Sequence, residues 1–176
     1  MSVFQENIYF FRGKYPEVFD AVNKFNEVVN RVDQRQYISC LTKNDEPNLE
    51  IQVEGKSLFL HSKYNAKAEA EKWGQSICNK IIGVKHLFIF GIGLGYFLEE
   101  ILLRTDAQDI FIYEPDMNIF NEYINKKLVS STLLDKRIKL LAIGDDGLTQ
   151  YHIANIIAGY ISDAFVTVSA PIYERL

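Results

Sequence analysis

Five residues have the types and the spacing that could hold a nucleotide-like ligand. Three glycines form a G-x-G-x-G turn directly after a strongly apolar segment. A glycine turn that passes at once into a helix brings backbone N–H groups, and the positive end of the helix dipole, close to a ligand. A glutamate follows 19 residues later, near the spacing at which Rossmann-type folds place a carboxylate on a ribose hydroxyl. An aspartate after a later apolar segment could lie over the base. The predicted cofactor-binding residues are Gly91, Gly93, Gly95, Glu114 and Asp145.

Each of these residues also has a purely structural explanation. The glycines can serve only to make a tight turn and to let the next helix pack close to the sheet. Their order differs from G-x-G-x-x-G, and it is commoner in methyltransferase-like sheets than in dinucleotide dehydrogenases. Both interpretations of the turn stay open. The sequence favours ligand contact for Glu114 and a helix N-cap for Asp116. A plain turn is the simpler interpretation of Asp145-Asp146-Gly147.

The residues after Gly83 alternate between expected strands and expected helices. The strands are apolar throughout, as in a parallel sheet that is covered by helices on both faces. Right-handed crossovers then give a doubly wound, Rossmann-like sheet, with its ligand crevice at the carboxyl ends of the strands. Gly91, Glu114 and Asp145 all lie at such ends. The expected strands are 86–90, 109–113, 138–143 and 164–168, and the expected helices are 96–104, 117–127 and 147–161.

The residues before Gly83 predict helices and a β-hairpin. Apolar residues recur at helical spacing, and Gly13 and Pro16 imply a short helix, a break and a longer helix. Asn65 is the expected N-cap of a later helix. We therefore expect an α/β fold in which an N-terminal segment, 1–82, and a Rossmann-like domain, 83–176, form one compact unit. The expected elements of the first part are helices within 7–32, hairpin strands 49–53 and 57–60, and a helix from 66 to about 80.

Composition and charge argue against several classes of function. The chain has 176 residues and a net charge of −4, with scattered basic residues. Nucleic-acid and anionic-membrane partners need a basic patch, so we expect neither. The longest apolar run is too short to span a bilayer and no secretory leader opens the chain, so we expect a cytoplasmic protein. The two cysteines, Cys40 and Cys78, and the three histidines fit no metal spacing, so we expect reduced thiols and no metal site.

A second polar cluster lies at His61-Ser62-Lys63-Tyr64-Asn65. A His, a Lys and a Tyr at a strand-to-helix junction could form an anion or sugar site. Alternatively, Ser62 and Asn65 cap the helix, Tyr64 packs beneath it, and His61 satisfies a local hydrogen bond. No Asp–His–Ser or Cys–His arrangement is evident. We therefore interpret the cluster as structural and predict no catalytic residue in this chain.

Three segments carry a resemblance to a known family. LHSKYNAKAEAEKW (60–73), FIFGIGLGYFLEEIL (88–102) and IYEPD (112–116), in this order, resemble the N-terminal part of the motility accessory factor family. Its members are bacterial flagellin glycosyltransferases, which transfer nonulosonic, sialic-acid-like sugars to Ser or Thr of flagellin. The opening NIYFFRGKYPEVFDAV and the closing APIYERL also fit. The resemblance implies flagellin and a following glycosyltransferase domain, expected after 176, as partners.

The resemblance carries over the glycine turn, the Tyr113–Asp116 motif and the His61–Tyr64 motif, but no catalytic residue and no identified cofactor. Two hypotheses remain. The chain is a non-catalytic module of a flagellin glycosyltransferase that could hold a nucleotide, or it is an S-adenosylmethionine-dependent methyltransferase-like enzyme. Nothing recognisable supplies an acceptor pocket or a catalytic base, and about four parallel strands fall short of a complete methyltransferase sheet. The sequence therefore favours the module.

Overall fold

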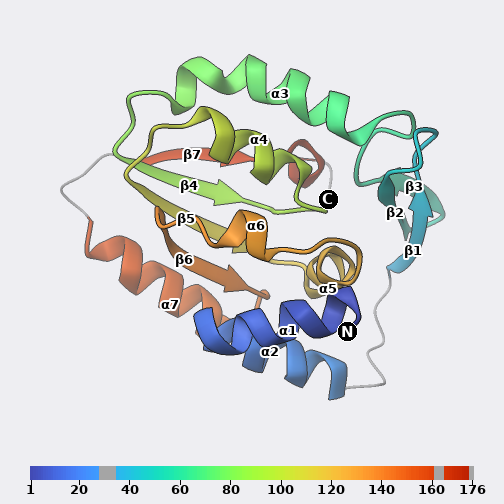
Figure 1. Cartoon of the computed structure of the whole chain (residues 1–176), viewed down its shortest axis with the longest axis horizontal. Coiled ribbons are helices and arrows are strands. Elements are labelled where there is room, and N and C mark those ends of the chain that lie inside the picture. Colours follow the sequence, from blue (N-terminus) through green and yellow to red (C-terminus); the bar gives the residue numbers. More distant parts are fainter. Residues whose placement is uncertain (28–34, 161–164, 175–176) are drawn as a thin grey trace.

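The computed structural model of the protein describes residues 1–27, 35–160 and 165–174 and has an α/β fold with two sheets (Figure 1). A four-stranded parallel sheet is flanked by helices, and a three-stranded antiparallel sheet lies beyond the carboxyl ends of the parallel strands. The helices are α1 (Val3–Lys14), α2 (Pro16–Glu27), α3 (Ala66–Ile81), α4 (Tyr96–Arg104), α5 (Met117–Lys126), α6 (Ser130–Leu133), α7 (Gly147–Ala158) and the 3-10 helix η1 (Pro171–Glu174). The strands are β1 (Gln36–Leu41), β2 (Pro47–Val53) and β3 (Lys56–Phe59) in the antiparallel sheet, and β4 (His86–Phe90), β5 (Asp109–Glu114), β6 (Ile138–Ile143) and β7 (Phe165–Ser169) in the parallel sheet.

The parallel sheet has the strand order β6-β5-β4-β7 and apolar side chains on both faces. On β5, Ile110 and Ile112 belong to the main core, on the side of α4 and α5. Phe111 and Tyr113 alternate with them and pack in a second cluster with Ile153 of α7. Figure 1 shows α3 and α4 on one side of the sheet and α7 on the other. This arrangement confirms the predicted Rossmann-like sheet with helices on both faces.

Most predicted elements are present with small changes of boundary. Strands β4 and β6 and helix α4 have the predicted bounds, and Pro16 begins α2 as expected. Strand β5 extends one residue further, to Glu114, and α5 ends one residue earlier, at Lys126. Helix α7 ends at Ala158, before its predicted end. Residue 161 in that helix, residue 164 in the predicted last strand and the predicted helix beyond 27 lie outside the described residues.

The predicted hairpin is present and belongs to a larger sheet, whose third strand the sequence did not predict. Strands β2 and β3 form the hairpin, and β1 pairs with β2 as a third, antiparallel strand. The β1 side chains are mostly exposed, so this edge strand lacks the apolar alternation that reveals a half-buried strand. Helix α6 and the 3-10 helix η1 were also not predicted. Each has four residues, too few to show a helical period.

A buried asparagine side chain joins the N-terminal helix to the end of α5 by hydrogen bonds. Asn7 of α1 is fully buried. Its amide nitrogen donates to the carbonyl oxygens of Ile124 and Lys127, both at 2.7 Å. Its amide oxygen accepts the N–H of Val129 at 3.0 Å. Asn7 thereby satisfies three backbone groups at the end of α5, which would otherwise be buried without partners.

We expect Asn7→Ala to lower the free energy of unfolding by about 3 kcal/mol, because it leaves buried polar groups unsatisfied and removes a buried side chain. Urea denaturation of the wild type and the variant measures this difference. Asn79→Ala, at an exposed position of α3, is the matched control and should change stability by less than about 0.5 kcal/mol. Equal stabilities of the two variants would contradict the role assigned to Asn7.

One hydrophobic core joins both parts of the chain. It contains Phe11 and Val22 from the N-terminal helices, Ile51 from the antiparallel sheet, and Ile89 and Ile112 from the parallel sheet. The division into 1–82 and 83–176 stays a prediction, and this shared core is consistent with the single unit that it assumed. In the described part of the chain, no helix has both the length and the apolar character needed to cross a membrane.

Candidate functional site

The backbone N–H groups of the glycine turn, Gly91–Gly95, are bound to acceptors of the chain itself. Its first and last glycines donate to backbone carbonyl oxygens at 2.7 and 3.0 Å. The N–H groups of Ile92 and Gly93 donate to Oε2 of Glu114 at 2.7 and 3.2 Å. Leu94 donates to an imidazole nitrogen at 3.2 Å. The positions that a ligand phosphate would occupy at these N–H groups are therefore filled by the protein.

Glu114 is the central acceptor of the site. It ends β5, is fully buried, and also accepts the N–H of Asp116 at 3.0 Å. The hydroxyl of Tyr173, from η1, lies 2.5 Å from both carboxylate oxygens. Burial raises the pKa of Glu114 to about 7, although the hydrogen bonds from Tyr173, Asp116 and Ile92 lower it. Among the described residues, Glu114 has hydrogen-bond donors but no ion pair. Its bonds join the glycine turn, the segment after β5 and η1 at the carboxyl edge of the sheet.

His61 provides the acceptor for the N–H of Leu94. Because its Nε2 accepts the Leu94 N–H, the ring proton lies on Nδ1. Nδ1 lies 3.8 Å from a carboxylate oxygen of Glu69. The side chain is fully buried, and burial, with a smaller contribution from the charge of Lys127, lowers the pKa of His61 to about 3. The imidazole is therefore neutral at pH 7 and serves as a fixed hydrogen-bond acceptor.

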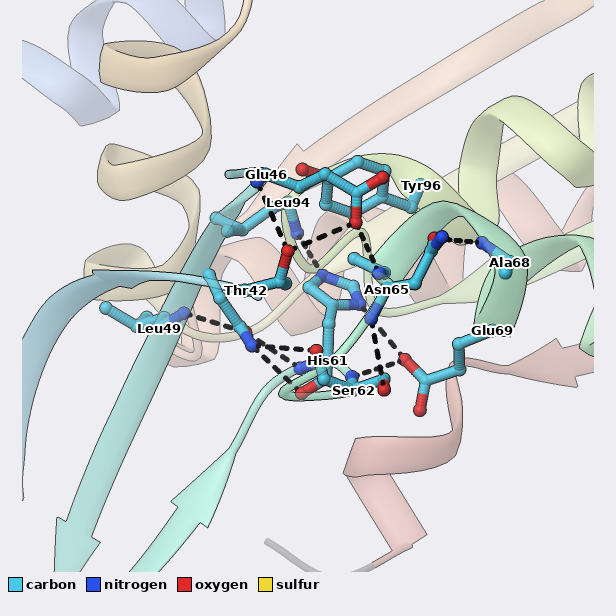
Figure 2. Close-up of polar contacts among 12 residues, drawn as sticks. Thr42, Glu46, Leu49, His61, Ser62, Asn65, Ala68, Glu69, Leu94 and Tyr96 are labelled. Atoms are coloured by element: carbon cyan, nitrogen blue, oxygen red, sulfur yellow. Dashed lines mark hydrogen bonds and ion pairs between the residues drawn. The ribbon is translucent and has the colours of Figure 1, made fainter. Parts of the chain in front are cut away.

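Bonds from β2 hold the loop between β3 and α3, and with it His61, in place (Figure 2). The side chain of Asn48 accepts the N–H of His61 at 3.0 Å and donates to its carbonyl oxygen at 3.0 Å. The N–H of Ser62 donates to Glu69 at 2.8 Å. Asn65 caps α3 by accepting the N–H of Ala68 at 2.7 Å, as predicted. These bonds support the structural interpretation of the 61–65 cluster and extend it, because His61 reaches the glycine turn.

Tyr64 differs from its prediction. It does not pack beneath α3, since its side chain is 63% exposed. The ammonium group of Lys43 lies 4.4 Å from the centre of the Tyr64 ring, a cation–π contact on the surface. Residues near a strand-to-helix junction can point either way, and the sequence gives no signal of which.

Two of the glycines have no room for a side chain. Gly91 and Gly95 have φ values of +86° and +85°, which L side chains rarely adopt. A Cβ atom on Gly91 would lie 2.1 Å from the ring of Tyr173, and one on Gly95 would lie 2.5 Å from the ring of Tyr123. The glycines are therefore packed against tyrosine rings from η1 and α5, contacts that differ from the helix-to-sheet packing that the sequence offered as their structural explanation.

Asp145 lies apart from the turn. It is exposed and follows the end of β6, and among the described residues no hydrogen bond or ion pair joins its side chain to residues 91–95. The neighbouring Asp146 caps α7 through the N–H groups of Leu148 and Thr149. The structure therefore brings Glu114 together with the three glycines and leaves Asp145 outside this contact network.

Sequence reasoning missed three residues of the site. Tyr173 and Tyr123 supply the rings beside the glycines, and His61 supplies an acceptor. His61 lies in the 61–65 motif, but no sequence pattern indicates Leu94 as its partner. Tyr173 and Tyr123 gave no signal, because contacts between segments distant in the chain do not follow from local periodicity.

A cavity of about 340 Å³ lies between the first turns of α3 and α4. Four glutamates and one lysine supply its charged lining, so it does not favour a phosphate. Within the residues that the structure describes, no group of three His, Cys, Asp or Glu side chains is placed to hold a metal ion. The residues that line the cavity are Glu46, Asn65, Lys67, Ala68, Ala70, Glu71, Tyr96, Glu99 and Glu100.

The fold resembles that of a solved glycosyltransferase. The structure of the MAf glycosyltransferase from Magnetospirillum magneticum AMB-1 superposes with a TM-score of 0.60 and 16% sequence identity, covering 96% of this chain and 32% of that one. A spermidine synthase from Thermotoga maritima gives a TM-score of 0.39 at 14% identity, over 66% of this chain and 51% of that one, and this likeness is too weak to bear on function.

Comparison of sequences identifies the family. An uncharacterised protein of Treponema pallidum (strain Nichols) is 23% identical over 163 residues, which cover 85% of this chain and 54% of that protein. This chain thus spans about half the length of that relative. The family described as the glycosyltransferase Maf N-terminal domain matches residues 30–122, more than half of the chain. The chain therefore belongs to the glycosyltransferase Maf N-terminal domain family.

Proposed function

We propose that this chain is the N-terminal accessory domain of a bacterial flagellin glycosyltransferase and acts in the cytoplasm. It supports the transfer of a nonulosonic acid to Ser or Thr of flagellin. The transfer chemistry belongs to a following glycosyltransferase domain, which this domain helps to position relative to flagellin.

The closed glycine turn is the observation that carries this proposal. A Rossmann-type enzyme uses the N–H groups of its glycine turn to bind the cofactor. Here Ile92, Gly93 and Leu94 donate to Glu114 and His61 instead. His61, next to the antiparallel sheet, and Glu114, at the end of β5, thus connect the turn to two other parts of the fold. This geometry favours a module that holds parts of an enzyme in place, and membership of the family supplies the enzyme class.

Intact-mass spectrometry of flagellin tests the proposal in a flagellated bacterium that carries this gene. We expect flagellin from a strain without the gene to lack the mass of the nonulosonic acid. Complementation with Gly13→Ala, a substitution that meets no atom within 4 Å, should restore the modification. Complementation with Gly95→Ala should fail. Flagellin of unchanged mass in the deletion strain would contradict the link to flagellin.

A second measurement tests the accessory role. The purified chain is incubated with flagellin and a CMP-activated nonulosonic acid, and the flagellin mass is measured. We expect no added mass from this chain alone. Transfer of the sugar would show that the chain carries the chemistry itself, and the accessory role would then be wrong.

The proposal includes a nucleotide-like ligand at the carboxyl edge of the sheet, near Gly91, Gly93, Gly95, Glu114 and Asp145. Glu114 supports the proposed ligand. It is a buried carboxylate at the end of β5, the second strand of the parallel sheet along the chain, which is where ribose-binding folds place such a group. The occupied N–H groups of the turn argue that such a ligand would be recognised through its nucleoside, with its phosphate outside the turn.

A further inference from the structure

Tyr173 lies directly against Glu114 and Gly91 at the carboxyl edge of the parallel sheet. Its hydroxyl donates to the carboxylate from 2.5 Å, and its ring lies where a Cβ on Gly91 would be. The ring also meets Phe90 edge-on, with 5.4 Å between ring centres. An aromatic ring and a hydroxyl donor are the two features that a base and a ribose would present to the same groups.

We propose that Tyr173 fills and closes a nucleoside site formed by Phe90, Gly91 and Glu114. The site opens when the Tyr173 side chain rotates away from Glu114. This inference rests on the proposed nucleotide-like ligand and adds its regulation. With Tyr173 displaced, Glu114 regains acceptor capacity towards the crevice, while its bonds to Ile92, Gly93 and Asp116 persist. A ribose hydroxyl takes the place of the phenol, and the base lies against Phe90.

The arrangement of η1 allows this opening. The opening we propose is a rotation of the Tyr173 side chain to another staggered rotamer, while the preceding Ile172, which is 3% exposed, stays in the core. The backbone is held independently, since Ala170 N–H donates to the carbonyl oxygen of Phe90 at 3.0 Å. The device is thus confined to one side chain.

The charges around the crevice define the class of ligand. Asp116 adds a second carboxylate beside Glu114 and accepts a hydrogen bond from Tyr37 at 2.6 Å. The guanidinium of Arg35 lies 3.5 Å from Asp116. Because Arg35 offsets the charge of Asp116, Glu114 is the main acceptor that faces the crevice, and a carboxylate favours neutral hydroxyl donors over a phosphate close to it. We therefore expect the site to recognise the nucleoside part of a ligand. Suitable test ligands share a ribose and differ in the rest of the molecule.

Calorimetric titration with S-adenosylmethionine and with cytidine 5′-monophosphate tests the inference. We expect Tyr173→Ala to bind at least one of them about tenfold more tightly than the wild type, because the closed state no longer competes. The 2′,3′-dideoxy analogue of the bound nucleoside should not bind, and Glu114→Gln in the same background should abolish the gain. Tyr151→Ala, which removes an exposed tyrosine of α7, is the matched control and should bind as the wild type does.

Tyr173→Phe provides a second variant that keeps the ring and removes only the hydroxyl, so it tests the inference even if Tyr173→Ala unfolds. It should bind more tightly than the wild type but less tightly than Tyr173→Ala. If both variants remain folded by circular dichroism and neither binds a probe more tightly than the wild type, the inference is wrong. That result would not affect the proposed role in flagellin glycosylation. Conversely, unchanged flagellin in the deletion strain would not affect the result of the titration.

Discussion

Replacing Gly95 by alanine is expected to lower the free energy of unfolding by about 4 kcal/mol, from two additive causes. The left-handed backbone of Gly95, with φ of +85°, costs an L residue about 1–2 kcal/mol. The new methyl group would also lie 2.5 Å from the Tyr123 ring. That ring is 1% exposed, so it cannot move aside without disturbing the core, which typically costs about 1–3 kcal/mol.

Two other glycines separate these causes. Gly55 has a φ of +75°, but a methyl group added there would meet no neighbour within 4 Å, so Gly55→Ala carries the backbone cost alone. Gly13 lies in α1 with no neighbour within 4 Å, and Gly13→Ala should stabilise by up to about 1 kcal/mol. Urea denaturation should show the largest loss of unfolding free energy for Gly95→Ala, a smaller loss for Gly55→Ala and no loss for Gly13→Ala. If Gly95→Ala cost no more than Gly55→Ala, the packing of the turn on Tyr123 would be contradicted.

The second large effect is a pH dependence that Glu114 introduces. Burial raises its pKa from 4.5 to about 7, so the folded protein keeps a proton that the unfolded chain releases above pH 4.5. The contribution of Glu114 to stability is therefore fully present below pH 4.5 and is lost as the pH rises through about 7. At 1.36 kcal/mol for each pH unit, the loss is about 3 kcal/mol.

His61 acts in the opposite direction over nearly the same range. Its pKa falls from 6.5 to about 3, so the unfolded chain takes up a proton that the folded protein refuses. This contribution is present above pH 6.5 and is lost as the pH falls towards 3. The two effects oppose one another between pH 4.5 and 6.5, so the wild type alone should show only a shallow profile there.

Comparison with Glu114→Gln isolates the glutamate. On acidification from pH 7.5 to 4.5, the wild type should gain about 3 kcal/mol relative to this variant, whose stability should fall more steeply because the His61 effect is unopposed. Urea denaturation at a series of pH values measures both profiles. Asp116 and Tyr173 also face Glu114, but the substitution retains both, and they should not produce the difference. Parallel profiles would show that Glu114 is not protonated in this range.

The repeating parts of the fold could be predicted from the sequence because they depend on local patterns. The uninterrupted apolar segments of β4, β5 and β6 require cover on both faces of the sheet. Asn65 and Asp116 bond N–H groups two or three residues ahead, so their roles as caps could also be predicted. Strand β1 could not, because most of its side chains are exposed at the edge of the sheet.

The site was predictable only in part, because its contacts join segments that are distant in the chain. The spacing of the glycines and Glu114 indicated that they would meet at the carboxyl edge. The pattern did not reveal that Glu114 would bind the turn itself, since a carboxylate suits a ribose and a backbone N–H equally well. Tyr173 lies 59 residues from Glu114, and His61 lies 33 residues from Leu94. No local period encodes such partners.

Amide hydrogen exchange of the ligand-free wild type, followed residue by residue by NMR, tests most directly whether the chain closes its own glycine turn. The N–H groups of Ile92, Gly93 and Leu94 should exchange as slowly as those in the interior of β4, because Glu114 and His61 hold them in the absence of any ligand. Exchange at the rate of unprotected peptide groups, with slowing only when a nucleotide is added, would contradict the account and show that the turn waits for a ligand.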